Sequence, residues 1–178
     1  MTIVVLASGT GTLAQAIFDA GFSVSALICD KEGAEVIKRA ERAGIPTILH
    51  PMTRDRNQWD KEMISHLDSL KPDLVVSAGF MRLLSPETVK RFKIINSHPA
   101  LLPLFPGAHA VRDALAAGAT ESGCSIHWVD EGVDTGRVIA QERVPIQSGD
   151  TEESLHERIK IVERGLIVAT IRSLQESL

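Results

Sequence analysis

The chain alternates between continuous apolar runs and segments in which apolar residues recur at helical spacing. Residues 2–7 (TIVVLA) and 73–78 (DLVVSA) are runs of β-branched and aliphatic residues, and residues 22–29 form a similar run. Such runs are typical of strands that are buried on both faces of a parallel sheet. Strands that alternate with amphipathic helices predict an α/β fold with one doubly wound, mostly parallel sheet of the Rossmann type.

The other expected elements follow from the same pattern and from turn and cap residues. One helix is expected to end near Leu70 and to bury Trp59, Met63, Ile64 and Leu67. The first helix is expected to start near Thr12 and to bury Leu13, Ala16, Ile17 and Ala20. Further helices are expected over residues 32–43, from near residue 85, over residues 109–117 and from near residue 151 onward, with a short strand over residues 46–49.

Two later strands are expected over residues 123–129 and 137–144. In the first of them, Ser125, His127 and Val129 alternate with more apolar neighbours. Strict alternation is typical of a strand with one solvated face. We therefore expect both strands to be less completely buried than the earlier ones and partly antiparallel.

Residues 93–107, KIINSHPALLPLFPG, combine an Ile-rich run with polar side chains and prolines. The run ends on Asn96, Ser97 and His98, and the prolines that follow exclude the interior of a helix or a sheet. Polar side chains at the carboxyl end of a buried strand are where open α/β sheets place their sites. We therefore expect a strand that carries an amide and an imidazole to the sheet edge, followed by a stiff loop.

Composition narrows the classes of function. A length of 178 residues suits one domain spanning residues 1–178. The net charge of -4 argues against nucleic acid as a partner, because no basic stripe is present to neutralise phosphates. No apolar run approaches the ~20 residues of a membrane span, and residues 1–7 are expected to be structural rather than a targeting segment. Cys29 and Cys124 lie in apolar runs and are expected to be buried free thiols, which indicates a reducing cytoplasm.

Residues 8–12 form a glycine-rich turn between the first strand and the first helix. Gly9, Gly11 and Ala14 fit the relaxed dinucleotide fingerprint G-x-G-x-x-A, and Asp30 follows about 20 residues later. Glycines let backbone N–H groups approach any anion at a helix N-terminus, so a lone phosphate would fit equally well. A tight turn without a ligand is the third interpretation.

Asn96, His98 and Asp134 are the expected reacting group. Asp134 stands in a glycine-flanked loop before a late strand, so its carboxylate could reach His98 and favour the protonated imidazole. Asn96 can donate an amide hydrogen bond to an oxygen that gains negative charge. No serine or cysteine stands in a nucleophile-elbow pattern, so we expect the substrate itself to supply the nucleophile.

The alternatives for these residues are structural. An Asn or His after a strand often caps a loop, and Asp134 could cap the turn of residues 132–136. No metal site is expected, because the other histidines show no ligand spacing and most of them are expected to be solvated or to support the site. They are His50, His66, His109, His127 and His156.

With these residues in place, the chain resembles the folate-dependent phosphoribosylglycinamide formyltransferases of purine synthesis. The similar motifs occur in the family's order and span nearly the whole chain. They are VVLASGTGT, DLVVSAGFMRLLSP, NSHPALLPLFPGAH, VDEGVDTG and HERIKIVE. The Phe-Pro-Gly in the third motif resembles the glycinamide branch more than the branch that formylates initiator tRNA.

The resemblance implies a formyltransferase fold and direct transfer of a formyl group from 10-formyltetrahydrofolate to the amine of glycinamide ribonucleotide, without metal or ATP. It implies that Asn96, His98 and Asp134 are catalytic. The residues that it implies for the ribotide phosphate and ribose are Gly11, Thr12, Leu13, Lys160 and Glu163. The residues that it implies for folate are Met81, Arg82, Leu83, Leu84, Asn96, Asp130, Glu131 and Asp134, with Phe80 as a further apolar wall.

Two departures from the family pattern stand out. Leu13 occupies a position where many relatives carry Asn, so this position can donate only its backbone N–H to a phosphate. The segment between Arg91 and Asn96 is shorter than usual. Lys160 and Glu163 could also be no more than an exposed ion pair.

The resemblance leaves two other functions open. One is a 10-formyltetrahydrofolate hydrolase, in which water replaces the amine, and the other is a dinucleotide-binding module built on the glycine turn. The expected partners are small molecules in the cytoplasm, without nucleic acid or membrane, and a homodimer is among the expected assemblies.

Overall fold

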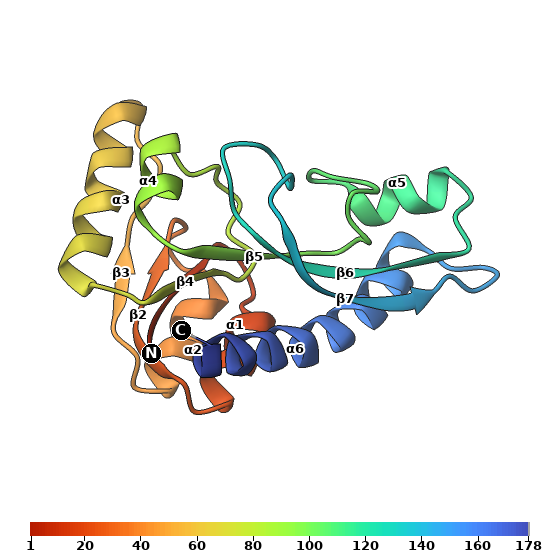
Figure 1. The fold of residues 1–178 in the computed structure, drawn as a ribbon, viewed down its shortest axis with the longest axis horizontal. Helices are drawn as coiled ribbons and strands as arrows, with labels where there is room; N and C mark the ends of the chain where they lie inside the picture. Colours follow the sequence, from red (N-terminus) through yellow and green to blue (C-terminus); the bar gives the residue numbers. More distant parts are fainter. Residues whose placement is uncertain (178) are drawn as a thin grey trace. The chain divides into compact units, whose positions relative to one another are not determined.

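A computed structural model describes residues 1–177 and divides the chain into two compact units. Unit 1 comprises Met1–Ile95, and unit 2 begins at Asn96. Figure 1 draws unit 1 in red to green and unit 2 in green to blue.

Four parallel strands form the sheet of unit 1. They are β1 (Thr2–Ala7), β2 (Ser23–Cys29), β3 (Thr47–Leu49) and β4 (Leu74–Ser77). Their order is β3-β2-β1-β4, and every neighbouring pair runs parallel. From Ile3 to Ala7, β1 is completely buried, because it is the inner strand between β2 and β4. The continuous apolar runs therefore mark parallel buried strands, as predicted.

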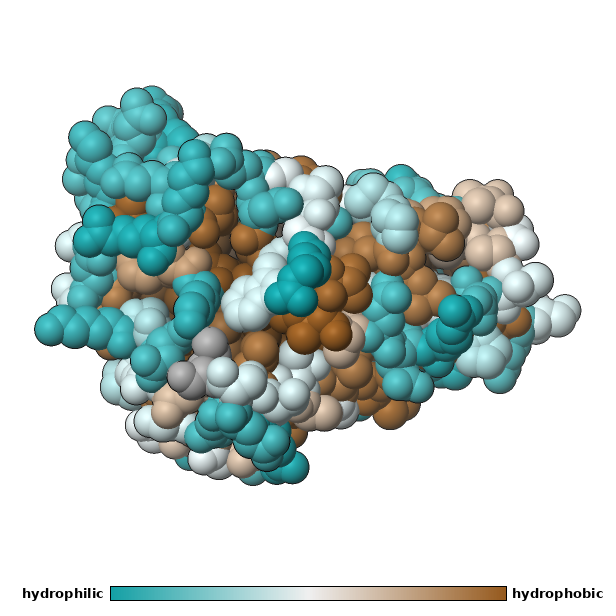
Figure 2. Space-filling view, in the orientation of Figure 1, coloured by the Kyte–Doolittle hydropathy of each residue, from teal (hydrophilic) through white to brown (hydrophobic). Residues whose placement is uncertain are grey.

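Four helices follow the strands of unit 1. They are α1 (Thr12–Asp19), α2 (Glu35–Arg42), α3 (Arg56–Leu70) and α4 (Pro86–Arg91). α3 buries Trp59, Met63, Ile64 and Leu67, which confirms the prediction from their spacing. The remaining side of α3 is polar, and Figure 2 shows a hydrophilic surface over this helix.

α1 buries a face that differs from the predicted one. Its buried residues are Leu13, Ala14, Ile17 and Phe18. Ala16 and Ala20, which we expected on this face, are only half-buried. Phe18 carries a much larger apolar surface than either alanine, so a face that includes it removes more apolar area from water.

Unit 2 contains three strands and two helices. They are β5 (Ile94–His98), whose first two residues belong to unit 1, α5 (Ala110–Ala116), β6 (Glu121–Trp128), β7 (Val138–Pro145) and α6 (Glu152–Ser177). The strand order is β5-β6-β7, and β6 and β7 pair antiparallel. α6 packs against β6 and β7 and contributes Leu155 and Ile159 to the core of the unit. The predicted α/β fold with antiparallel late strands is confirmed.

The prediction that β6 is partly exposed is wrong. Ser125 and His127, on the face predicted to be solvated, are only 0% and 2% exposed. The Ser125 hydroxyl donates to the Ala100 carbonyl at 2.6 Å and accepts from the Leu102 N–H at 3.0 Å, so the loop after β5 covers this face. Buried hydroxyl groups keep hydrogen bonds in this way, and alternation can therefore accompany complete burial. β7 is less completely buried than β1, β2 and β4, as predicted.

Three further expectations concern the chain as a whole. Cys29 and Cys124 are buried free thiols, as predicted. No helix within residues 1–177 is both long and apolar enough to cross a membrane. That residues 1–178 form a single domain stays a prediction.

Candidate active site

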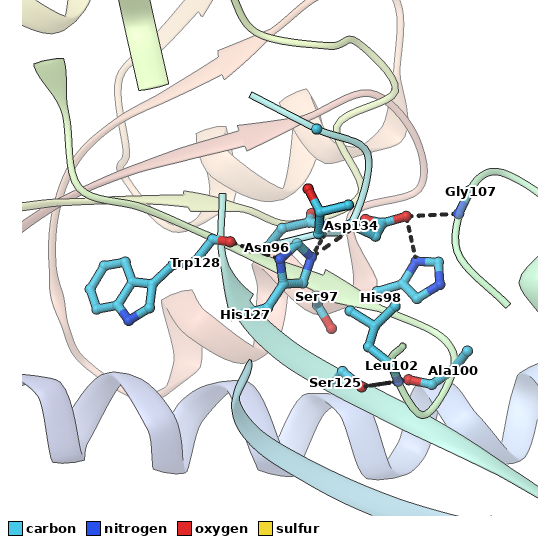
Figure 3. A network of polar contacts seen from close by, with 12 residues as sticks. Asn96, Ser97, His98, Ala100, Leu102, Gly107, Ser125, His127, Trp128 and Asp134 are labelled. Atoms are coloured by element: carbon cyan, nitrogen blue, oxygen red, sulfur yellow. Dashed lines mark hydrogen bonds and ion pairs between the residues drawn. The ribbon is translucent and has the colours of Figure 1, made fainter. Parts of the chain in front are cut away.

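The last residues of β5 carry the amide and the imidazole that we expected to react. Successive residues of a strand point to opposite faces, so Asn96 and His98 share one face of β5 and Ser97 points to the other. Figure 3 shows Asn96 and His98 in one group with His127 and Asp134. His98 is almost completely buried and Asn96 is half-buried.

A tight turn positions Asp134. The Asp130 carboxylate closes this turn, because its Oδ1 accepts from the Gly132 N–H at 3.0 Å and from the Thr135 hydroxyl at 2.7 Å. Asp134 has a φ of 55°, in the left-handed region that few residues other than Gly, Asn and Asp adopt. The residue that caps the turn is therefore Asp130, and the Asp134 carboxylate is directed elsewhere.

His98 lies between two oxygen acceptors. Its Nδ1 is 3.3 Å from Asp134 Oδ2, and its Nε2 is 2.8 Å from the Phe105 carbonyl oxygen. An imidazole that carries hydrogen on both nitrogens donates to both oxygens, whereas a neutral ring would turn one lone pair toward an oxygen. The geometry therefore suits a ring that carries hydrogen on both nitrogens.

His127 on β6 is a fourth member of the group, although in the sequence it is one of five scattered histidines without ligand spacing. Its Nδ1 donates to the Trp128 carbonyl at 2.9 Å, so Nε2 of the neutral ring is free to accept from Asn96 Nδ2 at 3.2 Å. The same Nε2 is 3.4 Å from Asp134 Oδ1. His127 thereby orients the Asn96 amide through one N–H and leaves the other for a ligand oxygen. The one feature of the sequence that could have pointed to His127 is its position two residues after Ser125, on the same face of the predicted strand.

Asp134 stays ionised although it is largely buried. Burial works against the charged form, but the neighbouring His127 ring, the hydrogen bond from the Gly107 N–H at 2.8 Å and the adjacent His98 ring together outweigh burial. The pKa of Asp134 is therefore lower than its ordinary value. The group therefore contains a carboxylate that stays charged beside two imidazole rings.

This arrangement suits attack on a carbonyl carbon by a nucleophile that the substrate brings. The free N–H of Asn96 and an N–H of His98 can donate to an oxygen that becomes negative. The carboxylate of Asp134 can accept a proton from an attacking nitrogen, directly or through water.

The glycine turn of unit 1 has the predicted form. Gly11 has a φ of 74° and precedes α1, and among the described residues no side chain caps the first turn of this helix. The backbone N–H groups at the start of α1 therefore remain available to an anion. A Cβ on Gly11 would lie 2.4 Å from Val36 Cγ2, so α2 packs too closely for a larger residue. Leu13 is buried, and its position offers only a backbone N–H.

Lys160 and Glu163 on α6 face different partners. Lys160 Nζ is 2.6 Å from Glu157 Oε1 at the surface, so the exposed pair that we considered forms with Glu157 instead of Glu163. Glu163 is buried and accepts the Ser97 hydroxyl at 2.5 Å. Burial raises the pKa of Glu163, and the Ser97 hydrogen bond and the Lys160 charge offset part of the rise.

The segment predicted to bind folate is an irregular loop of unit 1 between β4 and α4. Its Met81 and Leu83 are 74% and 64% exposed, and exposed large apolar residues of this kind often mark ligand or partner surfaces. The Ser8 hydroxyl accepts the Met81 N–H at 2.8 Å, and Arg82 Nε donates to Asp30 Oδ2 at 2.6 Å. Arg56 Nη2 donates to the Leu83 carbonyl, so the loop is anchored at three points.

Asp30 is a poor match for the acidic residue of a dinucleotide site. In such a site the carboxylate accepts ribose hydroxyls, but here Arg82 occupies Oδ2 and the residue is buried, which leaves only Oδ1 without a hydrogen-bond partner in the described part of the chain. The neighbouring depression has a volume of about 550 Å³ and is lined by Ser8, Gly9, Asp30, Lys31, Gly79, Met81 and Arg82. The dinucleotide-binding alternative is therefore not favoured.

The structure brings Asn96, His98 and Asp134 together within unit 2. Asp130 and Glu131, also predicted to contact folate, lie in the turn before Asp134 with exposed side chains. The glycine turn and the loop from Met81 to Leu84 belong to unit 1. That these parts act on one pair of ligands stays a prediction.

The remaining histidines lie outside the group. His50 is a core residue stacked on Trp59 with ring centroids 4.6 Å apart, and burial lowers its pKa, so it is an exception to the expectation that most of these histidines are solvated or support the site. His109 is exposed, and His66 and His156 are half-buried. Within residues 1–177, no three His, Cys, Asp or Glu side chains are grouped so that they could hold a metal ion.

Comparison with known sequences gives one family. The formyl transferase family matches residues 1–171. A phosphoribosylglycinamide formyltransferase of Mycobacterium tuberculosis strain H37Rv is 46% identical over 186 residues, which cover 97% of this chain and 84% of the relative. A protein of the same name from Escherichia coli K12 is 40% identical and covers 93% of this chain and 83% of its own length.

Solved structures agree with the sequence relatives. A glycinamide ribonucleotide transformylase from Symbiobacterium toebii has a TM-score of 0.95 at 37% identity, covering 99% of this chain and 88% of that chain. A glycinamide ribonucleotide transformylase from Geobacillus kaustophilus has a TM-score of 0.93 at 41% identity, covering 97% of both chains. The similarity therefore extends over nearly the whole chain and is not confined to a motif.

Proposed function

Because the chain belongs to the formyl transferase family, we propose that it transfers a formyl group from a folate donor to the amine of glycinamide ribonucleotide, a step of purine synthesis. Relatives that are similar over nearly the full length are phosphoribosylglycinamide formyltransferases. The observation that carries the proposal is the group of Asn96, His98 and Asp134, which supplies hydrogen-bond donors and a carboxylate. Such a group suits a reaction in which the substrate provides the nucleophile.

In the proposed reaction, the neutral amine of the ribotide attacks the formyl carbon of 10-formyltetrahydrofolate. A carbon–nitrogen bond forms, and the formyl oxygen becomes the negative oxygen of a tetrahedral intermediate. The free N–H of Asn96 donates to this oxygen, and the Nε2–H of His98 exchanges its Phe105 acceptor for the same oxygen. Asp134 holds the His98 ring in place for this purpose.

The intermediate breaks down when the bond between the formyl carbon and N10 of the folate is cleaved. The attacking nitrogen loses one proton and N10 gains one, so the transfer is balanced without a further reactant. Asp134 accepts the proton from the nitrogen and returns it to N10, with water as carrier. Since the substrates provide both nucleophile and leaving group, we expect that neither metal nor ATP is required.

The residues proposed to contact each ligand follow from the resemblance to the family. The ribotide phosphate meets the backbone N–H groups of Gly11, Thr12 and Leu13 and the charge of Lys160. The ribose hydroxyls meet Glu163. The folate contacts are Met81, Arg82, Leu83, Leu84, Asn96, Asp130, Glu131 and Asp134. Because Lys160 pairs with Glu157, the phosphate has to compete with a surface carboxylate.

An assay of formyl-donor consumption tests the proposal. The full chain is incubated with 10-formyltetrahydrofolate, with and without glycinamide ribonucleotide, while tetrahydrofolate and formate are quantified. We expect donor to be consumed only when the ribotide is present, with one formylated ribotide formed per donor. Consumption without ribotide, with release of formate, would identify a hydrolase and would contradict the transferase.

The proposal also covers where the enzyme acts in the cell and its oligomeric state. We propose that the enzyme acts in the cytoplasm on small molecules alone. A homodimer is proposed as its assembly, and sedimentation of the full chain at several concentrations tests it.

A further inference from the structure

A buried hydrogen bond links the reacting strand to α6. Ser97 lies between Asn96 and His98 in β5, but its side chain points to the opposite face. Its hydroxyl donates to Glu163 Oε1 at 2.5 Å, and both residues are 8% exposed. Figure 3 shows the Ser97 side chain pointing toward α6.

Glu163 requires donors at this position, because a buried carboxyl group without hydrogen bonds is costly. The charged and titratable groups that interact electrostatically with Glu163 are Lys160 and Arg164 on its own helix and the Cys124 thiol on β6. Burial raises the pKa of the Cys124 thiol to about 12, so this group is neutral. The donor from β5 is the hydroxyl of Ser97.

The hydrogen bond restricts how the carboxyl group of Glu163 can turn. A carboxylate has two oxygens that can each accept hydrogen bonds, and Ser97 uses Oε1. The terminal torsion of Glu is broad, so without a fixed partner the carboxyl plane takes many orientations. With Oε1 held by Ser97, Oε2 keeps a defined direction as an acceptor.

We propose that Ser97 is a positioning residue for the ribotide, because it holds Glu163 in the orientation that accepts a ribose hydroxyl. The inference rests on the proposed function, in which Glu163 binds the ribose. Strand β5 then positions both the ribose acceptor and the reacting groups. Ser97 orients the carboxyl group of Glu163, and its neighbours Asn96 and His98 carry the reaction. A ribotide bound to Glu163 is thereby placed in register with the reacting side chains.

The first test compares wild type, Ser97→Ala and Ser97→Thr in steady-state assays in which each substrate is varied in turn. Loss of one buried hydrogen bond is expected to raise the ribotide KM of Ser97→Ala by about 5–10-fold. The folate KM and kcat are expected to stay within about twofold of wild type, since the bond does not touch the folate or the reacting group. Ser97→Thr retains the hydroxyl and is expected to restore the ribotide KM.

The pH profile supplies a second readout. The Ser97 hydrogen bond lowers the pKa of Glu163, so its loss raises this pKa further. The acidic limb of kcat/KM for the ribotide is expected to move to higher pH in Ser97→Ala and to stay in place in Ser97→Thr. The limb measured for folate is expected to stay in place in both variants.

A double variant tests whether Ser97 acts through Glu163. If it does, Ser97→Ala combined with Glu163→Gln has the ribotide KM of Glu163→Gln alone. If Ser97→Ala is insoluble, Ser97→Cys replaces it, because the thiol has a similar volume and is a weaker donor. Its ribotide KM is expected to be higher than that of wild type.

Two results would overturn the inference. One is an unchanged ribotide KM in the variants that lose or weaken the donor. The other is a fall in kcat with a rise of both KM values, which is the result of a purely structural role, because Asn96 and His98 then shift with the strand. If the wild type forms no formylated ribotide, the proposed function itself fails, and this outcome is distinct from both.

Discussion

The group around Asp134 in unit 2 and the loop from Met81 to Leu84 in unit 1 are built in opposite ways. In the group, buried side chains contact one another. The carboxylate of Asp134 makes three of these contacts, with His98, His127 and the Gly107 N–H. In the loop, Met81 and Leu83 project into solvent. The loop is anchored by a backbone N–H, by Arg82 and by Arg56, which donates to a loop carbonyl.

The difference shows how chemistry and binding place different demands on a fold. Stabilising a charge that develops during reaction requires donors whose orientation is fixed in advance. Binding a large, partly apolar molecule requires exposed apolar surface on a supported backbone. Substitutions in the group around Asp134 should therefore change kcat, and substitutions in the loop should change KM for folate.

Asp134→Asn has the largest expected effect. We predict that kcat falls by about 10³-fold while both KM values stay within about threefold, because the carboxylate acts on the proton and on His98. Steady-state assays of the variant measure both quantities. Asp113→Asn on α5 is the matched control, since Asp113 is paired with Arg112 at the surface, and its kcat should equal that of wild type.

The pH dependence of the wild type sharpens this prediction. The pKa of Asp134 lies below its ordinary value of 3.8, so the carboxylate remains ionised as the pH falls to 4. Loss of kcat through protonation of Asp134 is therefore expected only below that pH. A loss that tracks protonation of Asp134 between pH 5 and 6 would contradict the assigned environment.

His127→Ala is expected to lower kcat by about 10-fold, because Asn96 loses the acceptor that orients its amide. His127→Gln can accept through its amide oxygen and should recover part of the loss. The control is His109→Ala, at an exposed position of unit 2, which should leave kcat unchanged. Equal kcat values in His127→Ala and His109→Ala would show that Asn96 needs no such partner.

Leu83→Ser tests the loop of unit 1. We predict a rise of about 3–10-fold in the folate KM with kcat unchanged, because the substitution removes apolar contact area from an exposed side chain. The melting temperature should not fall, since Leu83 is 64% exposed. Leu49→Ser, at another exposed apolar position of unit 1, should change neither constant. A loss of kcat in Leu83→Ser would remove the contrast between the loop and the group around Asp134.

Glu157→Gln has the smallest expected effect. Its carboxylate holds Lys160 at the surface, so its removal should lower the ribotide KM by about twofold, in keeping with the small energy of exposed ion pairs. The gain should disappear at high salt, where the wild-type pair is already screened. An increase in ribotide KM would show that Glu157 supports the phosphate site.

Much of the fold is predictable from local patterns. The continuous apolar runs identify β1 and β4, and the spacing from Trp59 to Leu67 identifies the buried face of α3, because each signal depends on neighbours in sequence. Burial of β6 was not predictable in this way. The loop after β5 covers Ser125, and the residues that meet it, Ala100 and Leu102, lie more than twenty positions away.

The residues of the candidate site also fall into those that local sequence predicts and those that depend on contacts between distant parts of the chain. Asn96 and His98 could be predicted from a strand that ends in polar residues before prolines, whereas the role of His127 depends on which strand pairs beside it. The ion-pair partner of Lys160 could not be predicted either, because Glu157 and Glu163 both lie three positions from it in the sequence. Only the packing of α6 shows that Glu163 is buried against Ser97 and that Glu157 is free to pair at the surface.

The most direct test of the proposed reaction follows the bond that forms. The full chain is given 10-formyltetrahydrofolate labelled with ¹³C in the formyl group and glycinamide ribonucleotide labelled with ¹⁵N in its amine, and the products are followed by ¹³C NMR. We predict a formyl signal that is split by one-bond coupling to ¹⁵N and that grows far more slowly with Asp134→Asn. Labelled formate as the sole product would contradict direct transfer to the ribotide amine.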